Sequence, residues 1–150
     1  MAKQMVKILL RGSEPDEAET LWASSLGNDH YKLDNSPFYA YGVSWEDVVE
    51  AFPNDGVLEF ARCVTKSGNR TLRVILDSVD ENLESRTVLE RIRQLGCSYE
   101  GMNSRLISIN VPPDTDFAAG TTYLTKETDT RWEYADPTYE KVTGEQVERQ

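Results

Sequence analysis

The chain has 150 residues and a mass of 17.0 kDa, a size that fits one domain or two very small ones. Its 26 Asp and Glu outnumber its 16 Lys and Arg, for a formal net charge of −10, and the cations are scattered. This charge argues against a nucleic-acid-binding protein, because phosphates would be repelled. With 39% hydrophobic residues and six Pro, the composition excludes a disordered or fibrous chain.

The amino-terminal segment, residues 1–11, shows no targeting signal. Charged side chains interrupt it every few residues, whereas a signal peptide needs an apolar run of roughly 7–15 residues. The longest apolar runs, 8–10 and 74–76, are far shorter than the roughly 18 residues of a membrane-spanning helix. We therefore expect a cytoplasmic protein without membrane contact. In that reducing compartment Cys63 and Cys97 are expected to be buried thiols and not a disulfide.

Short predicted strands separated by turn residues occupy the first half of the chain. These strands are 6–11, 19–26, 30–34, 38–41, 47–52 and 57–66. The segments 27–29 and 53–56 are rich in Gly, Asn, Asp and Pro, so each predicts a hairpin turn. In the last strand, alternation places Leu58, Phe60, Arg62 and Val64 on one face. This series of short strands predicts a small, curved, barrel-like sheet.

A strand at 70–77 is followed by a predicted helix. Its apolar residues recur at the three- and four-residue spacing of an amphipathic helix: Val88, Leu89, Ile92 and Leu95. A capping box of Ser78 and Glu81, or alternatively Asp80, is predicted to start this helix. Gly96 lies where a left-handed residue is expected after the helix end.

Two strands, a second helix and a last strand complete the second half. The strands are 98–102, 106–111 and 132–134, and the short helix is capped by Asp114, Thr115 or Asp116. Residues 69–136 thus follow the order of a ferredoxin-like βαββαβ unit, in which two helices cover one face of a four-stranded antiparallel sheet. The predicted fold class is α+β, with a barrel-like part at 1–68, a ferredoxin-like part at 69–136 and a mobile charged tail at 137–150.

Several linked motifs resemble one bacterial family. They are Leu21-Trp22-Ala23, Leu33-Asp34-Asn35-Ser36-Pro37-Phe38, Gly42-Val43-Ser44-Trp45-Glu46-Asp47-Val48-Val49-Glu50-Ala51, Ser67-Gly68 and Leu95-Gly96-Cys97. Together they make the chain similar, over roughly residues 5–135, to the family catalogued as domain of unknown function 4265. The resemblance implies a bacterial, cytoplasmic protein, and it implies no activity, cofactor or catalytic residue. Ser36 departs from the pattern, because an apolar residue is expected before the Pro-aromatic pair.

Candidate catalytic and metal-binding groups are few. His30 is the only histidine and follows a predicted turn, where a solvated imidazole is expected. A dyad of His30 with Cys63 or Cys97 requires the fold to bring them together, and these residues lack the spacing of a zinc site. Acidic pairs such as Asp47 with Glu50 are typical of helix caps and solvated surfaces. We therefore predict no catalytic residue, no metal and no cofactor.

The segment 34–47 is unusual because aromatic residues crowd around Pro37 and Gly42. One interpretation is that the aromatic side chains fill the barrel core, since alternate residues of a strand point inward. The other is that they line an exposed patch or groove, because Tyr and Trp are frequent anchors of protein interfaces. The candidate partner-binding residues are Asp34, Tyr39, Tyr41, Trp45, Asp47 and Glu50.

Three functions fit this sequence. The leading hypothesis is a non-enzymatic module whose acidic surface captures a basic protein, for example an immunity-type antitoxin. The first alternative is a ferredoxin-like regulatory domain that senses a metabolite. The second alternative is a small enzyme of unknown reaction that uses carboxylates or Cys97 in a cleft.

Overall fold

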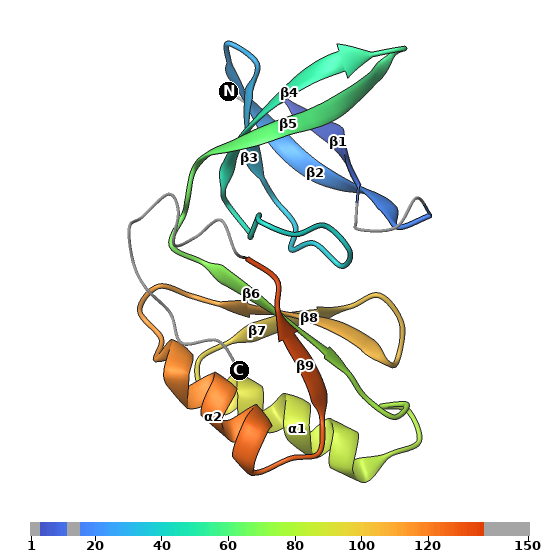
Figure 1. The fold of residues 1–150 in the computed structure, drawn as a ribbon, viewed down its shortest axis with the longest axis vertical. Helices are drawn as coiled ribbons and strands as arrows, with labels where there is room; N and C mark the ends of the chain where they lie inside the picture. The colour runs from blue at the N-terminus through green and yellow to red at the C-terminus, as the bar shows by residue number, and fades with distance from the viewer. Residues whose placement is uncertain (1–3, 12–15, 137–150) are drawn as a thin grey trace.

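The computed structural model describes residues 4–11 and 16–136 and has two lobes, an all-β lobe followed by an α+β lobe (Figure 1). The first lobe contains β1 (Met5–Arg11), β2 (Ala18–Gly27), β3 (His30–Leu33), β4 (Val48–Asn54) and β5 (Val57–Thr65). The second lobe contains β6 (Arg70–Ile75), α1 (Leu83–Gln94), β7 (Ser98–Gly101), β8 (Leu106–Val111), α2 (Phe117–Lys126) and β9 (Arg131–Tyr134). This architecture confirms the predicted α+β fold class. The predicted boundary at 68–69 falls between β5 and β6, and the predicted tail at 137–150 lies outside the described residues.

The five strands of the first lobe close into a barrel in sequence order. Consecutive strands pair antiparallel, and a parallel pairing of Leu9 with Glu59 joins β1 to β5. The barrel core is formed by Ile8, Leu10, Leu21, Ala23, Leu33, Ala40, Val43, Val49 and Ala51. Both predicted hairpins form. Between β4 and β5, Asp55 and Gly56 have φ angles of +52° and +78°, the left-handed pair that a tight two-residue turn requires.

The connection between β3 and β4, residues 34–47, lies between the two lobes and is called the linking segment (Figure 1). The predicted strand at 38–41 is wrong, because the backbone here bonds to other acceptors. The N–H groups of Phe38 and Tyr39 donate to the Glu19 carboxylate at 2.9 and 3.0 Å. The Gly42 N–H donates to the carbonyl that follows β9, at 2.9 Å. These acceptors satisfy the backbone without a strand partner.

The predicted alternation of β5 holds only for part of the strand. Two irregularities in its pairing with β4 shift the register. Phe60 packs against the barrel core, but Arg62, expected on the same face, is exposed, and Cys63 packs against the core instead. An extra residue in one strand exchanges the two faces beyond it, which explains the difference.

The second lobe has a four-stranded antiparallel sheet with α1 and α2 on one face, as predicted (Figure 1). Its strand order, which the sequence left open, is β7-β8-β6-β9. Helices and sheet share an apolar core of Leu72, Val74, Leu76, Val88, Leu89, Ile92, Cys97, Ile107, Ile109, Val111 and Leu124. On the other face, four buried polar side chains contact the linking segment or the β5–β6 connection: Thr71, Arg73, Ser108 and Asn110. The apolar face therefore builds the core of the lobe, and the polar face builds the contact between lobes.

The helix starts differ in how well they were predicted. α1 begins after Asn82, whose side chain accepts an N–H of the first turn. The predicted caps at Ser78 and Asp80 are wrong, because the preceding residues form a separate turn. α2 begins after Asp116, one of its three predicted caps, and Gly96 has the expected left-handed φ of +97°. Neither of these two helices, the ones found in the described part of the chain, is long and apolar enough to cross a membrane.

Candidate functional site

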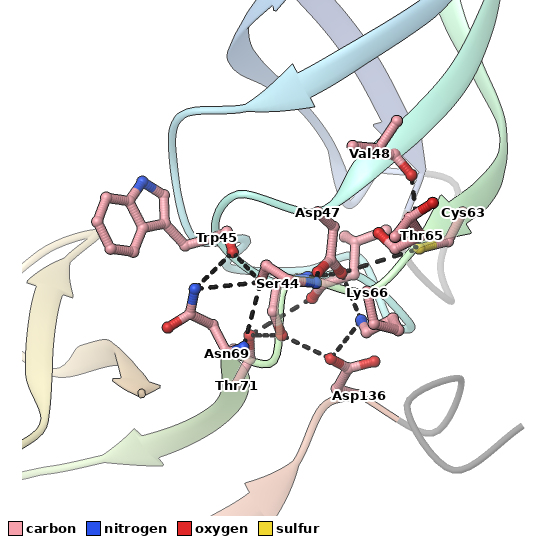
Figure 2. Close-up of polar contacts among 12 residues, drawn as sticks. Ser44, Trp45, Asp47, Val48, Cys63, Thr65, Lys66, Asn69, Thr71 and Asp136 are labelled. Atoms are coloured by element: carbon pink, nitrogen blue, oxygen red, sulfur yellow. Dashed lines mark hydrogen bonds and ion pairs between the residues drawn. The ribbon is translucent and has the colours of Figure 1, made fainter. Parts of the chain in front are cut away.

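A buried ion-pair cluster joins the two lobes (Figure 2). Lys66, which follows β5, contacts the carboxylates of Asp47 in the linking segment and of Asp136 after β9, the latter at 2.5 Å. All three side chains are at most 1% exposed. Charges buried this completely are tolerated only while they remain paired, so the contacts of Lys66 hold the cluster together.

Hydroxyl and backbone groups from both lobes complete this cluster. The Ser44 hydroxyl donates to Asp136 at 2.6 Å and lies 2.6 Å from the Thr71 hydroxyl of β6. The Asp47 carboxylate accepts the N–H groups of Ser44 and Ser67, each at 2.8 Å. The cluster thus connects the linking segment, the β5–β6 connection, β6 and the end of β9 (Figure 2). It fixes the two lobes relative to one another.

Lys66 is a fixed cation at neutral pH. Burial lowers the pKa of Lys66, but the contacts with Asp47 and Asp136 outweigh burial and raise the pKa above its ordinary value of 10.5. The stability that this side chain contributes is therefore present below pH 10.5 and is lost as the pH rises through the raised pKa. A side chain so completely buried and paired has no access to a substrate, which gives the cluster a structural role.

A groove also lies between the lobes and encloses about 520 Å³. It is lined by Leu9, Ala18, Glu19, Thr20, Leu21, Asn35, Ser36, Phe38, Tyr39, Glu100 and Met102, from β1, β2, the linking segment and the end of β7. Apolar and aromatic side chains form much of its wall, and its two charged residues, Glu19 and Glu100, are both carboxylates. A groove of this composition suits a ligand that combines apolar surface with positive charge.

Glu19 positions the aromatic wall of the groove. Its carboxylate accepts the N–H of Phe38 through both oxygens, at 2.9 and 3.0 Å, and the N–H of Tyr39 at 3.0 Å. Burial raises the pKa of Glu19, and these N–H groups and the charge of Arg73 partly offset the rise. Because the linking segment uses this carboxylate as an acceptor, Glu19 acts mainly as a support for Phe38 and Tyr39.

Glu100 is the less satisfied carboxylate of the groove. Glu100 belongs to an exposed strand, and only part of its carboxylate is shielded from solvent. This partial burial and the negative charge of Asp34 raise the pKa of Glu100, and the Ser36 N–H partly offsets the rise. Over residues 4–11 and 16–136, no lysine or arginine forms an ion pair with Glu100. Asp34 is exposed. These two carboxylates therefore leave uncompensated negative charge at this wall of the groove.

Arg73 of β6 holds the linking segment on the second lobe. Its side chain is 4% exposed, donates through Nη2 to the Ala40 carbonyl, and lies 4.7 Å from the centre of the Tyr41 ring. Glu133 lies 3.5 Å from Nη1 and accepts the Tyr41 hydroxyl at 2.8 Å. Burial lowers the pKa of Arg73, and the charges of Glu133 and Glu19 partly offset it. The guanidinium thus connects the linking segment with β6 and β9.

The structure places four of the six predicted partner-binding residues at or near the surface between the lobes. Tyr39 lines the groove, and Asp34 lies near its Glu100 wall. Tyr41 is 42% exposed, and Trp45 is half-buried with its indole directed away from the ion-pair cluster (Figure 2). None of these aromatic side chains belongs to the barrel core, so the interpretation that they fill it is wrong.

The other two predicted residues lie elsewhere. Asp47 is fully buried in the ion-pair cluster, which corrects its assignment to a partner-binding surface. Glu50 lies on the barrel wall, where it pairs with Arg62 at 3.1 Å and with His30 at 3.7 Å. It does not line the groove. The half-buried His30 lies beside the Glu50 carboxylate and is not part of a dyad with a cysteine.

Sequence reasoning missed Glu19, Lys66, Arg73 and Glu100. One signal was available for Arg73: the alternation of β6 places it on the face opposite the apolar residues, although not what it contacts. Glu100 lies in the strand predicted at 98–102, but the strand pattern does not show that it lines a groove. No local pattern points to Lys66 or to Glu19, because their partners are remote in the sequence.

Both cysteines are free thiols, as predicted. Cys97 is buried as expected, but Cys63, also expected to be buried, is only half-buried. Burial raises the pKa of Cys97 to about 11. Burial together with the charge of Asp47 raises the pKa of Cys63 to about 12. Because the thiolate is the reactive form of cysteine, these raised pKa values keep both thiols protonated at neutral pH.

We expect iodoacetamide at pH 8 to alkylate both cysteines at least about 100-fold more slowly in the folded protein than in urea, because the thiolate fraction falls tenfold per pKa unit. Site-resolved mass spectrometry measures the two rates. The raised pKa values also make stability depend on pH. The stability contributed by the protonated thiols is present below pH 9.0 and is lost as the pH rises through the folded-state pKa values. Equal rates in folded and unfolded protein would contradict the burial of these thiols.

A second cavity, of about 620 Å³, lies in the second lobe between the start of α1 and the end of α2. Its charged lining residues are Asp77, Glu84, Arg105, Glu127, Asp129 and Arg131. Hydroxyl groups of serine and threonine residues and of a tyrosine complete the wall. None of the predicted partner-binding residues lines this cavity.

The fold and the groove define a two-lobed α+β protein with an acidic and aromatic surface between its lobes. The chain belongs to the DUF4265 family, a domain of unknown function, whose model matches residues 19–134, and this confirms the resemblance seen in the sequence. A solved structure, that of a hypothetical protein from Neisseria gonorrhoeae, is similar to the chain with a TM-score of 0.69 and 18% identity. The match covers 90% of this chain and 95% of that one, and at this identity it shows a shared fold alone. No curated protein matches the sequence.

Proposed function

We propose that this protein is a non-enzymatic, cytoplasmic protein-binding module that captures a basic protein. The observation that carries the proposal is the groove between the lobes, where Phe38, Tyr39 and Met102 lie with the carboxylate of Glu100. Aromatic and apolar side chains supply contact area, and the carboxylate supplies attraction and specificity. The net charge of −10 adds steering of a basic partner from a distance.

An immunity-type antitoxin is the concrete form of this proposal. Such a protein holds a basic toxin domain and blocks its action. Opposite charges accelerate the encounter, which favours a small acidic protein for this task. The buried ion-pair cluster supports the same task, because a groove between fixed lobes loses little conformational freedom when a partner binds.

Affinity capture from a lysate of the host tests the proposal. We expect the tagged protein to retain a basic protein in stoichiometric amount at low salt and to release it at moderate salt, because ions screen exposed charges. The bound proteins are identified by mass spectrometry, with an unrelated protein of equal net charge as the control. A failure to capture any partner at either salt, or a partner that binds the control equally, would refute the proposal.

A pair of charge reversals separates a specific surface from net charge. Asp34→Lys and Glu90→Lys change the net charge by the same amount. Asp34 lies near the groove, whereas Glu90 is exposed on α1, which covers the opposite face of the second sheet. We expect Asp34→Lys to abolish capture and Glu90→Lys to leave it near the wild-type level. An equal loss in both variants would show that net charge alone holds the partner.

A metabolite-sensing regulatory domain is the second candidate, favoured by the cavity of about 620 Å³ in the second lobe. Arg105, Arg131 and the hydroxyl groups of its wall suit a small polar molecule. A ligand that binds only the folded state raises the Tm by mass action. A thermal shift with a metabolite, together with no captured protein, would favour this function over the first.

A further inference from the structure

We propose that the groove between the lobes binds an arginine side chain of the partner, with the guanidinium paired to Glu100 and packed against Phe38 and Tyr39. This inference rests on the proposed function and adds to it the chemical group that the groove recognises. Three observations carry it. The groove is open and encloses about 520 Å³, the Glu100 carboxylate has no cationic partner, and Glu19 fixes the backbone of the aromatic wall through hydrogen bonds.

The available negative charge is concentrated at Glu100. Both carboxylate oxygens of Glu19 already accept N–H groups of the linking segment. Glu133, the nearest acid to Tyr41, already contacts Arg73. Glu100 receives the Ser36 N–H and faces the charge of Asp34, so a cation placed here gains attraction from two carboxylates. An arriving guanidinium would form charge-assisted hydrogen bonds with the Glu100 carboxylate.

Arginine fits this groove better than lysine. A guanidinium is planar, donates two parallel hydrogen bonds to one carboxylate and stacks on aromatic rings, whereas an ammonium is more strongly hydrated. Arginines of the protein show this packing, since Arg73 lies 4.7 Å from the Tyr41 ring centre and Arg70 lies 4.6 Å from that of Phe117, although Lys7 also lies over a ring, 5.0 Å from the centre of Trp22. The apolar lining of the groove suits the methylene stem of the side chain.

Two matched peptides test the site. One is acetyl-Gly-Gly-Arg-Gly-Gly-amide, and the other replaces Arg by citrulline, which keeps the shape and removes the charge. In a titration of ¹⁵N-labelled protein followed by NMR, we expect the arginine peptide to shift the amide signals of Ser36, Glu100 and Met102. The citrulline peptide is expected to leave them in place. Equal shifts with both peptides, or none in the groove, would overturn the proposal.

Matched variants locate the binding energy. Glu100→Gln keeps an acceptor for the Ser36 N–H, and Glu90→Gln makes the same charge change on the exposed surface of α1. We expect Glu100→Gln to raise the Kd of the arginine peptide about tenfold, the effect of losing a hydrogen bond to a charged group, and Glu90→Gln to leave it unchanged. An equal change of Kd in the two variants would overturn the arginine site. Tighter binding of the same peptide with Lys in place of Arg would overturn it as well.

The outcomes also separate this inference from the proposed function. If a basic protein is captured and Glu100→Gln holds it as tightly as the wild type does, the protein-binding function stands and the arginine site is wrong. If the arginine peptide binds in the groove but the lysate yields no partner, the proposed function is wrong and the groove remains a site for a guanidinium.

Discussion

Lys66→Met is expected to lower the free energy of unfolding by about 3–5 kcal/mol, the cost of breaking a buried ion pair by removing one partner. Methionine fills a similar volume, but it leaves the carboxylates of Asp47 and Asp136 buried without the cation that contacts both. Urea-induced unfolding followed by tryptophan fluorescence measures the change. The effect is expected to be the largest of any substitution considered, because the cluster lies where both lobes meet.

Two further variants control this result. Lys32→Met removes the same side chain from a pair with Glu46 at 3.2 Å, but Lys32 is 38% exposed, so the expected cost is at most about 1 kcal/mol. Combining Lys66→Met with Asp47→Asn and Asp136→Asn removes the unpaired charges and is expected to recover part of the loss. If Lys66→Met and Lys32→Met were equally stable, the cluster would not hold the lobes together.

The parts of the fold that follow from neighbours in sequence were predictable. β6 alternates apolar residues such as Leu72 and Val74 with Thr71 and Arg73, and this alternation correctly indicates a strand with one apolar face. The apolar spacing of α1 and the left-handed residue at Gly96 are equally local. The order of these elements was then sufficient to predict a ferredoxin-like unit with two helices on one antiparallel sheet, although not the order of its strands.

The errors arose where remote contacts override local preference. The segment 38–41 has the aromatic composition of a strand, but its N–H groups bond to Glu19, a side chain that no local pattern connects with it. The exchange of Arg62 and Cys63 depends on irregular pairing with β4, which the sequence of β5 alone does not reveal.

The candidate site was predictable only in part, as the fold was. Composition drew attention to Tyr39 and Asp34, because aromatic and acidic residues are concentrated in the linking segment. The burial of Asp47 was not predictable, since it depends on Lys66, and Lys66 in turn contacts Asp136, 70 residues further along the chain. From sequence alone a carboxylate is expected on the surface, because Asp and Glu are rarely buried unless the fold pairs them with a cation.

Arg73→Met is expected to lower the free energy of unfolding by about 2–3 kcal/mol and to loosen the linking segment. The Ala40 carbonyl loses its buried donor, and Glu19 loses the positive charge that offsets its burial. The Ser108 hydroxyl still donates to the Pro37 carbonyl at 2.9 Å, and the ion-pair cluster remains. The cost is therefore expected to be smaller than that of Lys66→Met.

Hydrogen exchange of the Gly42 amide distinguishes loosening of the segment from a general loss of stability. This N–H donates to the Ala135 carbonyl at 2.9 Å and so reports whether the linking segment stays on the second lobe. We expect its protection to fall more in Arg73→Met than the protection of the β6–β8 ladder, and to stay unchanged in Arg93→Met, which removes an exposed guanidinium from α1. Because the same segment carries Phe38 and Tyr39, the arginine peptide is expected to bind Arg73→Met more weakly. Unchanged Gly42 protection in Arg73→Met would mean that Arg73 only fills space beneath the segment.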